Sequence, residues 1–243
     1  MKQTEFIMGM PITIEIPNFE ERRPFKEAFS YFREVDERFS TYKDTSEIMQ
    51  INRGELPKSE YSPAMNEVLR LCEETKQKTK GYFDIKKPDG SLDPSGLVKG
   101  WSIYNAAKLI AGLGIKEFYV DASGDIEVRG KLWDIGIKNP FNQEEIIKVV
   151  YIKDKGIATS GTYIRGDHIY DPMTGKNNID EIVSLTVIGP NVYEADRFAT
   201  AAFAMGKAGI DFIETLPGFE GYLVDKAGVA TMTTGFEPYT VSP

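Results

Sequence analysis

Three hydroxyl side chains surround one glycine in the segment Ala158-Thr159-Ser160-Gly161-Thr162. The glycine lets backbone N–H groups turn inward beside the hydroxyls, which would form a cradle for a phosphate or pyrophosphate. His168, the only histidine of the chain, follows shortly after, and Asp171 begins a turn-forming sequence. A segment of this kind is also often a plain loop, and a single histidine is often a surface or core residue.

A carboxylate and a hydroxyl lie four residues apart at Asp196 and Thr200, inside a small-residue helix predicted over 194–206. This spacing places both side chains on one face of the helix. They are hard oxygen ligands of the kind that suits Mg²⁺. A capping aspartate and a threonine bonded to its own helix would give the same pattern. We expect the Asp196 carboxylate to face the surface, so that its removal would spare the core.

A third candidate is the turn with Ser95 and Gly96 at the start of a predicted helix, followed by Lys99. Free N–H groups at a helix N-terminus and the helix dipole add to the ammonium charge, so this turn suits an anionic group. Its spacing differs from that of a Walker A loop, which excludes a P-loop site.

Small residues at two further places would let a ligand approach the backbone. Gly9 lies in the first predicted strand, and Ser123-Gly124 separates two strands just before Asp125. For the second place a simple hairpin turn is the alternative. Tyr42 is predicted on a loop, where its ring would either stack on a planar ligand or close the core.

Composition limits the class of protein. The length of 243 residues suffices for one large domain or two closely joined ones. A net charge of −8 argues against a nucleic-acid partner, because such binding needs a basic face. The single cysteine, Cys72, is expected to be a small buried residue.

No apolar run approaches the ~18 residues of a membrane span. No export signal is recognisable, so we expect a cytoplasmic protein, the alternative being that an export signal has been removed.

Apolar residues that recur every three or four positions predict helices over 24–39, over 62–80 and from the Ser95 turn to about Gly112. Thr45 or Ser46 would cap a further short helix. Alternating patterns predict strands over 6–16, 81–85, 118–128 with a central break, 132–137, 146–152, 151–157, 183–189, 221–224 and 229–233. We expect 132–137 and 146–152 to extend the same sheet as the others. Short connections favour antiparallel sheets and an α+β fold.

Eight segments in a fixed order resemble the ApbE family, the FAD:protein FMN transferases. They are Met8-Gly9 before a strand, FSTY followed by SEIMQIN, GYFDI, DPSGLVKGW, SGDI, IATSGTY, HIYDPMTG and EADRFATAAFAMG. Each segment alone is a weak signal, but the ordered set is specific and covers nearly the whole chain.

The resemblance implies a single flavin transferase domain over 1–243 with two intimately joined lobes. Its fold would be related to the T-fold, with mostly antiparallel sheets, flanking helices and the ligand between the lobes. FAD would be the substrate. With the help of Mg²⁺, its FMN half would pass to a Thr or Ser hydroxyl of an acceptor protein, and AMP would leave. Acceptors in the family are flavin-carrying subunits of membrane electron-transfer complexes and certain reductases.

Residue by residue, the resemblance implies metal ligation by Asp196, Thr200 and the backbone carbonyl near Gly96. His168 would help deprotonate the acceptor hydroxyl, a task that suits a neutral imidazole near pH 7. Asp171 would orient this imidazole or serve as the base itself. The implied FAD-binding positions are Met8, Gly9, Tyr42, Asp84, Lys99, Ser123, Gly124, Asp125, Thr159, Ser160 and Gly161.

The chain departs from the family pattern at several positions. The usual Asn-Ala-Gly-Gly-Asp-Ile reads Asp121-Ala122-Ser123-Gly124-Asp125-Ile126, Met10 replaces a threonine, and Tyr104 replaces an aspartate. These changes could alter FAD affinity or the alignment of the transfer reaction. Two other functions stay open: a Mg²⁺-dependent FAD pyrophosphatase that releases FMN and AMP, and a non-catalytic FAD-binding protein.

Overall fold

An eight-stranded antiparallel sheet forms the centre of the molecule in a computed structural model, which describes residues 1–161 and 181–241. Neighbouring strands are antiparallel throughout the order β1-β2-β3-β4-β7-β8-β9-β10, which confirms the prediction from the short connections. The strands are β1 (Lys2–Ile7), β2 (Met10–Glu15), β3 (Phe118–Ala122), β4 (Asp125–Arg129), β7 (Lys155–Gly161), β8 (Ile182–Gly189), β9 (Glu220–Asp225) and β10 (Ala230–Met232).

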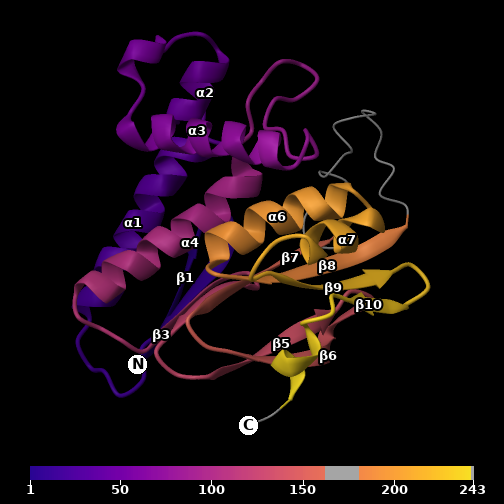
Figure 1. Ribbon diagram of the computed structural model, residues 1–243. Coiled ribbons are helices and arrows are strands. Elements are labelled where there is room, and N and C mark those ends of the chain that lie inside the picture. The colour runs from indigo at the N-terminus through magenta and orange to yellow at the C-terminus, as the bar shows by residue number, and fades with distance from the viewer. Residues whose placement is uncertain (162–180, 242–243) are drawn as a thin grey trace.

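Helices cover one face of this sheet (Figure 1). One apolar cluster joins α1 and α4 to β1, β2 and β3, and a second joins α6 and α7 to β7, β8 and β9. A third cluster packs α2 and α3 against the end of α1 and the first turns of α4. The helices are α1 (Arg23–Phe39), α2 (Glu47–Asn52), α3 (Pro63–Lys78), α4 (Ser95–Gly112), α6 (Val192–Ala204) and α7 (Ala208–Glu214), with 3₁₀ turns η1 (Lys58–Glu60) and η2 (Glu237–Thr240).

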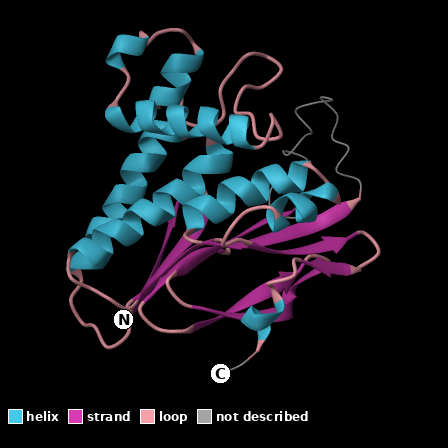
Figure 2. Cartoon of the chain, in the orientation of Figure 1, coloured by secondary structure: helices cyan, strands magenta, loops and turns pink. Residues whose placement is uncertain are grey.

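A separate two-stranded sheet, β5 (Trp133–Asn139) with β6 (Asn142–Ile152), packs on the opposite side (Figure 2). Trp133, Ile135 and Ile137 are buried, and they join an apolar cluster with residues of β4, β7 and η2. The prediction that these strands extend the main sheet is therefore wrong. Alternation identified the strands, but their pairing depends on contacts with distant parts of the chain.

The four longer helices confirm the three predictions from apolar periodicity and the prediction of a small-residue helix over 194–206, with ends that differ by at most two residues. Ser46 caps α2, because its side chain accepts a hydrogen bond from the Met49 amide at 3.2 Å. Cys72 is buried as predicted, and burial raises the pKa of its thiol. Among the helices that the structure describes, none combines the length and the apolar character needed to cross a membrane.

Three predicted strands differ from the structure. Residues 151–157 are not one strand, because they span the end of β6, a bend at 153–154 and the start of β7. Residues 6–16 are not one strand, because Met8 and Gly9 form the turn of the β1–β2 hairpin, with φ angles of 56° and 73°. Residues 81–85 are not a strand but follow the end of α3 as a loop. In this loop the Phe83 amide donates to Thr79 Oγ1 at 3.1 Å, and the Phe83 ring is buried. Apolar residues in that segment therefore reflect burial of a loop.

The crossing of α4 and α6 depends on Gly100. A Cβ atom at this position would lie 2.6 Å from Asp196 Cβ and 2.8 Å from the Val192 carbonyl oxygen. We expect Gly100→Ala to force the helices apart and to lower the free energy of unfolding by about 1–3 kcal/mol. Urea unfolding followed by circular dichroism measures this loss.

The matched control is Gly112→Ala, on the same helix, where an added Cβ would meet no atom within 4 Å. Alanine is the better helix former, so this variant should be as stable as the wild type or more stable by about 0.5–1 kcal/mol. Equal stability of the two variants would mean that the helix crossing tolerates the extra carbon.

Candidate functional site

Three segments named by the sequence analysis meet at one end of the main sheet. They are the turn Met8–Gly9, the turn Ser123–Gly124 and the end of β7 at Thr159–Gly161. The antiparallel register places the start of β2 beside the end of β3, and the start of β4 beside the later part of β7. The structure thus brings together residues that are about 150 positions apart in the chain.

The first turns of α4 bring Lys99 to this end of the sheet. Its Nζ atom lies 2.5 Å from Asp125 Oδ2 on β4 and 4.0 Å from Asp196 Oδ1 on α6. Asp196 Oδ2 accepts a hydrogen bond from the Gly100 amide at 2.7 Å, and Asp125 Oδ1 accepts one from the Thr159 amide at 3.1 Å. We call Lys99, Asp125 and Asp196 the buried charge cluster.

This cluster holds two carboxylates and one ammonium group, so its carboxylates outnumber its cations. Burial raises the pKa of Asp196 well above its usual range, the Lys99 ammonium lowers it, and the neighbouring Asp125 carboxylate raises it. Burial disfavours the ionised form of a carboxyl group, and a cation beside the group stabilises that form. The arrangement therefore has the electrostatic character of a cation site.

Two further oxygen atoms lie one helical turn from the cluster. The Thr200 hydroxyl, on α6, donates to the Gly96 carbonyl oxygen, on α4, at 3.4 Å. The residues that the structure describes contain no group of three or more His, Cys, Asp or Glu side chains arranged for a metal. A cation here would instead take one carboxylate, one hydroxyl and one backbone carbonyl, a set of hard oxygen donors that fits Mg²⁺.

The expectation of a surface-facing Asp196 is wrong. This residue is 3% exposed, because α4 crosses α6 at that point and covers its carboxylate. The four-residue spacing correctly placed Asp196 and Thr200 on one face of the helix. The partners that bury this face, Lys99 and Gly100, are nearly a hundred positions away in the chain and are not visible from the local pattern.

The glycine-centred cradle is also not formed as predicted. Thr159, Ser160 and Gly161 are part of β7, and they pair with Thr186, Leu185 and Ser184 of β8. These three residues follow the path of a strand rather than of a loop around an anion, and Thr162, the last residue of the predicted cradle, lies outside the described residues. The Thr159 hydroxyl hydrogen-bonds with the Thr186 hydroxyl at 2.8 Å, and its amide is the one that reaches Asp125.

The Ser123–Gly124 turn is the hairpin that the sequence analysis kept as the alternative. Both residues have positive φ angles, 54° and 96°. Asp121 fixes the turn, because its carboxylate accepts hydrogen bonds from the Gly124 amide at 2.7 Å and from the Tyr119 hydroxyl at 2.8 Å. Burial raises the pKa of Asp121. The departure from the family pattern at this position thus has a structural role in the turn.

The other predicted FAD-binding residues lie around this end or apart from it. Met8 packs between two apolar clusters, with its sulfur 4.0 Å from the Ser102 hydroxyl of α4. Tyr42 lies on the predicted loop and is 95% exposed, so both faces of its ring are open. Asp84 forms an ion pair with Lys76 at 2.7 Å, a contact that serves the loop after α3. His168 and Asp171 lie outside the described residues.

Sequence reasoning missed Glu127, which is fully buried on β4. Its Oε2 atom accepts a hydrogen bond from the Val192 amide in the first turn of α6 at 2.7 Å, and its Oε1 atom forms an ion pair with Arg129 at 2.5 Å. Glu127 therefore anchors the start of the helix that carries Asp196. A charged residue between two buried apolar residues, Ile126 and Val128, was the available signal.

Burial raises the pKa of Glu127 to about 7, although Arg129 and the Val192 amide act in the opposite direction. The folded protein thus binds this proton more tightly than the unfolded chain. The contribution of this proton to the free energy of unfolding is complete below the unfolded pKa of about 4.5 and is lost as the pH rises through 7. Between pH 4.5 and pH 7.5 the free energy of unfolding of the wild type should fall by about 3 kcal/mol relative to that of Glu127→Gln.

Urea unfolding of both proteins at pH 4.5 and pH 7.5 measures this difference. The exposed residue Glu21 supplies a control, because Glu21→Gln should follow the wild type at both pH values. If the free energies of unfolding of the wild type and Glu127→Gln changed with pH by the same amount, Glu127 would not bind its proton more tightly in the folded protein.

Comparison with known proteins identifies the family. A sequence model described as the ApbE family matches residues 8–87 and 85–223. The chain belongs to the ApbE family. Among ApbE relatives, the FAD:protein FMN transferase of Escherichia coli strain K12 is 28% identical over 207 residues, which are 77% of this chain and 59% of the relative. That of Vibrio cholerae is 31% identical over 134 residues, 49% of this chain and 40% of the relative. The chain thus spans about three fifths or less of the length of these curated relatives.

Solved ApbE structures have the same fold. The ApbE protein of Thermotoga maritima superposes with a TM-score of 0.87 at 19% identity, covering 100% of this chain and 99% of that one. The flavin transferase ApbE of Vibrio cholerae gives a TM-score of 0.84 at 22% identity and 98% coverage of each chain. The predicted α+β class with mostly antiparallel strands and flanking helices is confirmed.

Proposed function

We propose that this chain transfers FMN from FAD to a Thr or Ser hydroxyl of an acceptor protein and releases AMP. Membership of the ApbE family supports the proposal, as do the relatives named FAD:protein FMN transferase. The observation that carries it is the buried charge cluster with its excess of carboxylates, one helical turn from the Gly96 and Thr200 oxygens. Transfer of a phosphoryl group depends mainly on positioning and on neutralising charge.

Mg²⁺ would be held by the Asp196 carboxylate, the Thr200 hydroxyl and the Gly96 carbonyl. When bound, it would neutralise charge on the pyrophosphate and polarise its P–O bonds. The Gly100 amide fixes one oxygen of Asp196 and leaves the other, Oδ1, with Lys99 at 4.0 Å as its nearest cation. The Lys99 side chain, which is 14% exposed, would add a second positive charge beside the pyrophosphate.

The acceptor hydroxyl oxygen would form a bond to the phosphorus of the FMN half, and the anhydride bond between this phosphorus and AMP would break. The proton of the hydroxyl would pass to His168, with Asp171 as its orienting group or as the base. The exposed ring of Tyr42 and the turns at Met8–Gly9 and Ser123–Gly124 would contact FAD. Asp84 joins this set on the resemblance alone, because its carboxylate is paired with Lys76.

One incubation tests the proposal. The purified protein is mixed with FAD, Mg²⁺ and flavin-carrying subunits of electron-transfer complexes as candidate acceptors, and intact-mass spectrometry measures the products. We expect an acceptor to gain the mass of FMN less one water, with one AMP released per label, and we expect EDTA to abolish labelling. Release of FMN and AMP without labelling would make the chain a pyrophosphatase. FAD binding without turnover would make it a binding protein. A cytoplasmic location is proposed with it, and cell fractionation tests that point.

A further inference from the structure

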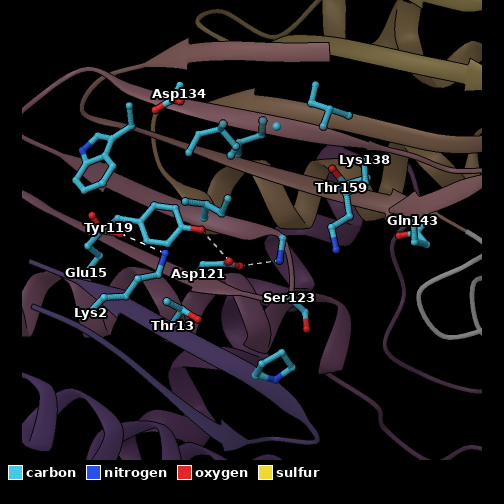
Figure 3. Close-up of a pocket in the computed structure, with 18 of the residues that line it drawn as sticks. Lys2, Thr13, Glu15, Tyr119, Asp121, Ser123, Asp134, Lys138, Gln143 and Thr159 are labelled. Atoms are coloured by element: carbon cyan, nitrogen blue, oxygen red, sulfur yellow. Dashed lines mark hydrogen bonds and ion pairs between the residues drawn. The ribbon is translucent and has the colours of Figure 1, made fainter. Parts of the chain in front are cut away.

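A trough of about 690 Å³ lies between the main sheet and β5. In Figure 3, Asp134 and Lys138 of β5 lie along one side, and Tyr119, Asp121 and Ser123 lie along the other. We use the name trough for this space, whose walls are β5 on one side and outward-facing residues of β2, β3 and β7 on the other. Its size is that of a typical ligand site.

The wall formed by β5 is a strand edge. All six consecutive residues from Trp133 to Lys138 line the trough, although alternate side chains of a strand point to opposite faces. Consecutive residues of a strand can all line one space when the backbone edge of the strand, rather than one face, borders that space. Within the described part of the chain, β5 pairs with β6 on its other edge. The trough-facing edge therefore offers backbone N–H and C=O groups over roughly 20 Å.

The charges of the trough are balanced. Its lining contains three lysines and three carboxylates, namely Lys2, Lys131, Lys138, Glu15, Asp121 and Asp134. Three of these groups already have partners, since Lys2 lies 3.3 Å from Glu15 and Asp121 accepts hydrogen bonds from Tyr119 and Gly124. A nucleotide or another strong anion would find no excess of positive charge here. Polypeptide backbone, which is neutral and carries donors and acceptors in alternation, matches such a wall.

One end of the trough reaches the candidate active site. Ser123, Gly124 and Thr159 line the trough, and the Thr159 amide is bonded to Asp125 of the buried charge cluster. Figure 3 shows Ser123 and Thr159 toward the same end of the space. A chain lying along β5 would thus arrive beside the groups that hold the pyrophosphate in the proposed reaction.

We propose that the trough binds an extended segment of the acceptor polypeptide, which pairs with β5 as an additional strand and delivers its hydroxyl at the Ser123–Thr159 end. This inference rests on the proposed function. Recognition through backbone groups specifies the path of the acceptor and leaves most of its side chains free to vary. The acceptor would therefore need an accessible extended segment next to its Thr or Ser.

Backbone methylation of the acceptor tests the strand pairing. The probe is a peptide of about ten residues centred on the hydroxyl that the labelling assay identifies, made as a series with one N-methylated amide each. In an added strand, alternate amides point toward the partner strand. We expect methylation of alternate residues to raise the KM for the peptide about tenfold and methylation of the others to leave it within about twofold. A series without this alternation would overturn the proposal.

A substitution in the trough tests its place in the molecule. Thr13, on β2, lines the trough. Its partner on β1 is Thr4, which does not line the trough, and the two hydroxyl groups form a hydrogen bond of 2.9 Å. Thr13→Trp and Thr4→Trp both remove this bond and add the same bulk. We expect Thr13→Trp to raise the KM for the peptide about tenfold while the KM for FAD stays unchanged, and Thr4→Trp to match the wild type.

Equal kinetics of the two tryptophan variants would overturn the trough as the acceptor site, with the transferase activity left intact. Failure of the wild type to label any acceptor would instead overturn the proposed function and the inference with it. The two failures differ in the wild-type reaction, which is measured first.

Discussion

Asp196→Asn is expected to lower the rate of FMN transfer by about 10²–10³ while the protein stays folded. Asparagine has the same shape, and its side-chain oxygen can still accept the hydrogen bond from the Gly100 amide. The substitution removes one negative charge from a position that is 3% exposed, so water cannot replace it. The lower rate would therefore result from weaker cation binding rather than from altered packing.

Turnover at saturating FAD and thermal unfolding with and without Mg²⁺ measure the two parts of this prediction. Mg²⁺ should raise the Tm of the wild type and leave that of Asp196→Asn unchanged, because a ligand stabilises only the state that binds it. Asp211→Asn, on the exposed side of α7, is the matched control and should behave as the wild type. Wild-type turnover by Asp196→Asn would remove Asp196 from the metal site.

His168→Ala is expected to lower the transfer rate by at least about a hundredfold at saturating FAD, with FAD affinity nearly unchanged. The acceptor hydroxyl has a very high pKa, so its attack on phosphorus benefits from a base within hydrogen-bond reach. The chain contains no other histidine that could replace His168. Asp171 is the remaining candidate for the base, which makes Asp171→Asn the informative companion variant.

Single-turnover kinetics between pH 5 and pH 8 test this role. A histidine base must be neutral, so the wild-type rate should fall toward acidic pH, and His168→Ala should lose this dependence. Transfer by His168→Ala within a few-fold of the wild type would remove His168 from the mechanism. The same conclusion would follow if weaker FAD binding accounted for the whole loss.

The sequence predicted the elements whose pattern is local. The helices α1 and α3 each have an apolar stripe with helical period, and this stripe is what they bury, whereas α4 and α6 are buried on most sides. Ser46 caps α2 for the same local reason, since the bond spans only three residues. The turn at Met8–Gly9 escaped detection because methionine rarely adopts a positive φ and is not a typical turn residue.

Features that depend on distant partners could not be predicted in the same way. The segment around Thr159 has the composition of a loop, yet pairing with β8 makes it a strand. Burial of Asp196 depends on Gly100, and the placement of β5 depends on an apolar face of the main sheet. The resemblance to ApbE proteins singled out Lys99, Asp125 and Asp196, but their burial and their ion pairs became visible only in three dimensions.

The fixed position of α6 has a consequence for the size of the ion that the proposed metal site accepts. Glu127 holds the first turn of α6, and Gly100 lets α4 cross it in contact with Asp196, so the backbones that carry Gly96 and Thr200 cannot separate freely. Ca²⁺ needs oxygen distances of about 2.3–2.6 Å, against about 2.0–2.1 Å for Mg²⁺. A clamped pair of helices would therefore discriminate against the larger ion, and Gly100→Ala, which spreads the helices, would shift the preference toward Ca²⁺.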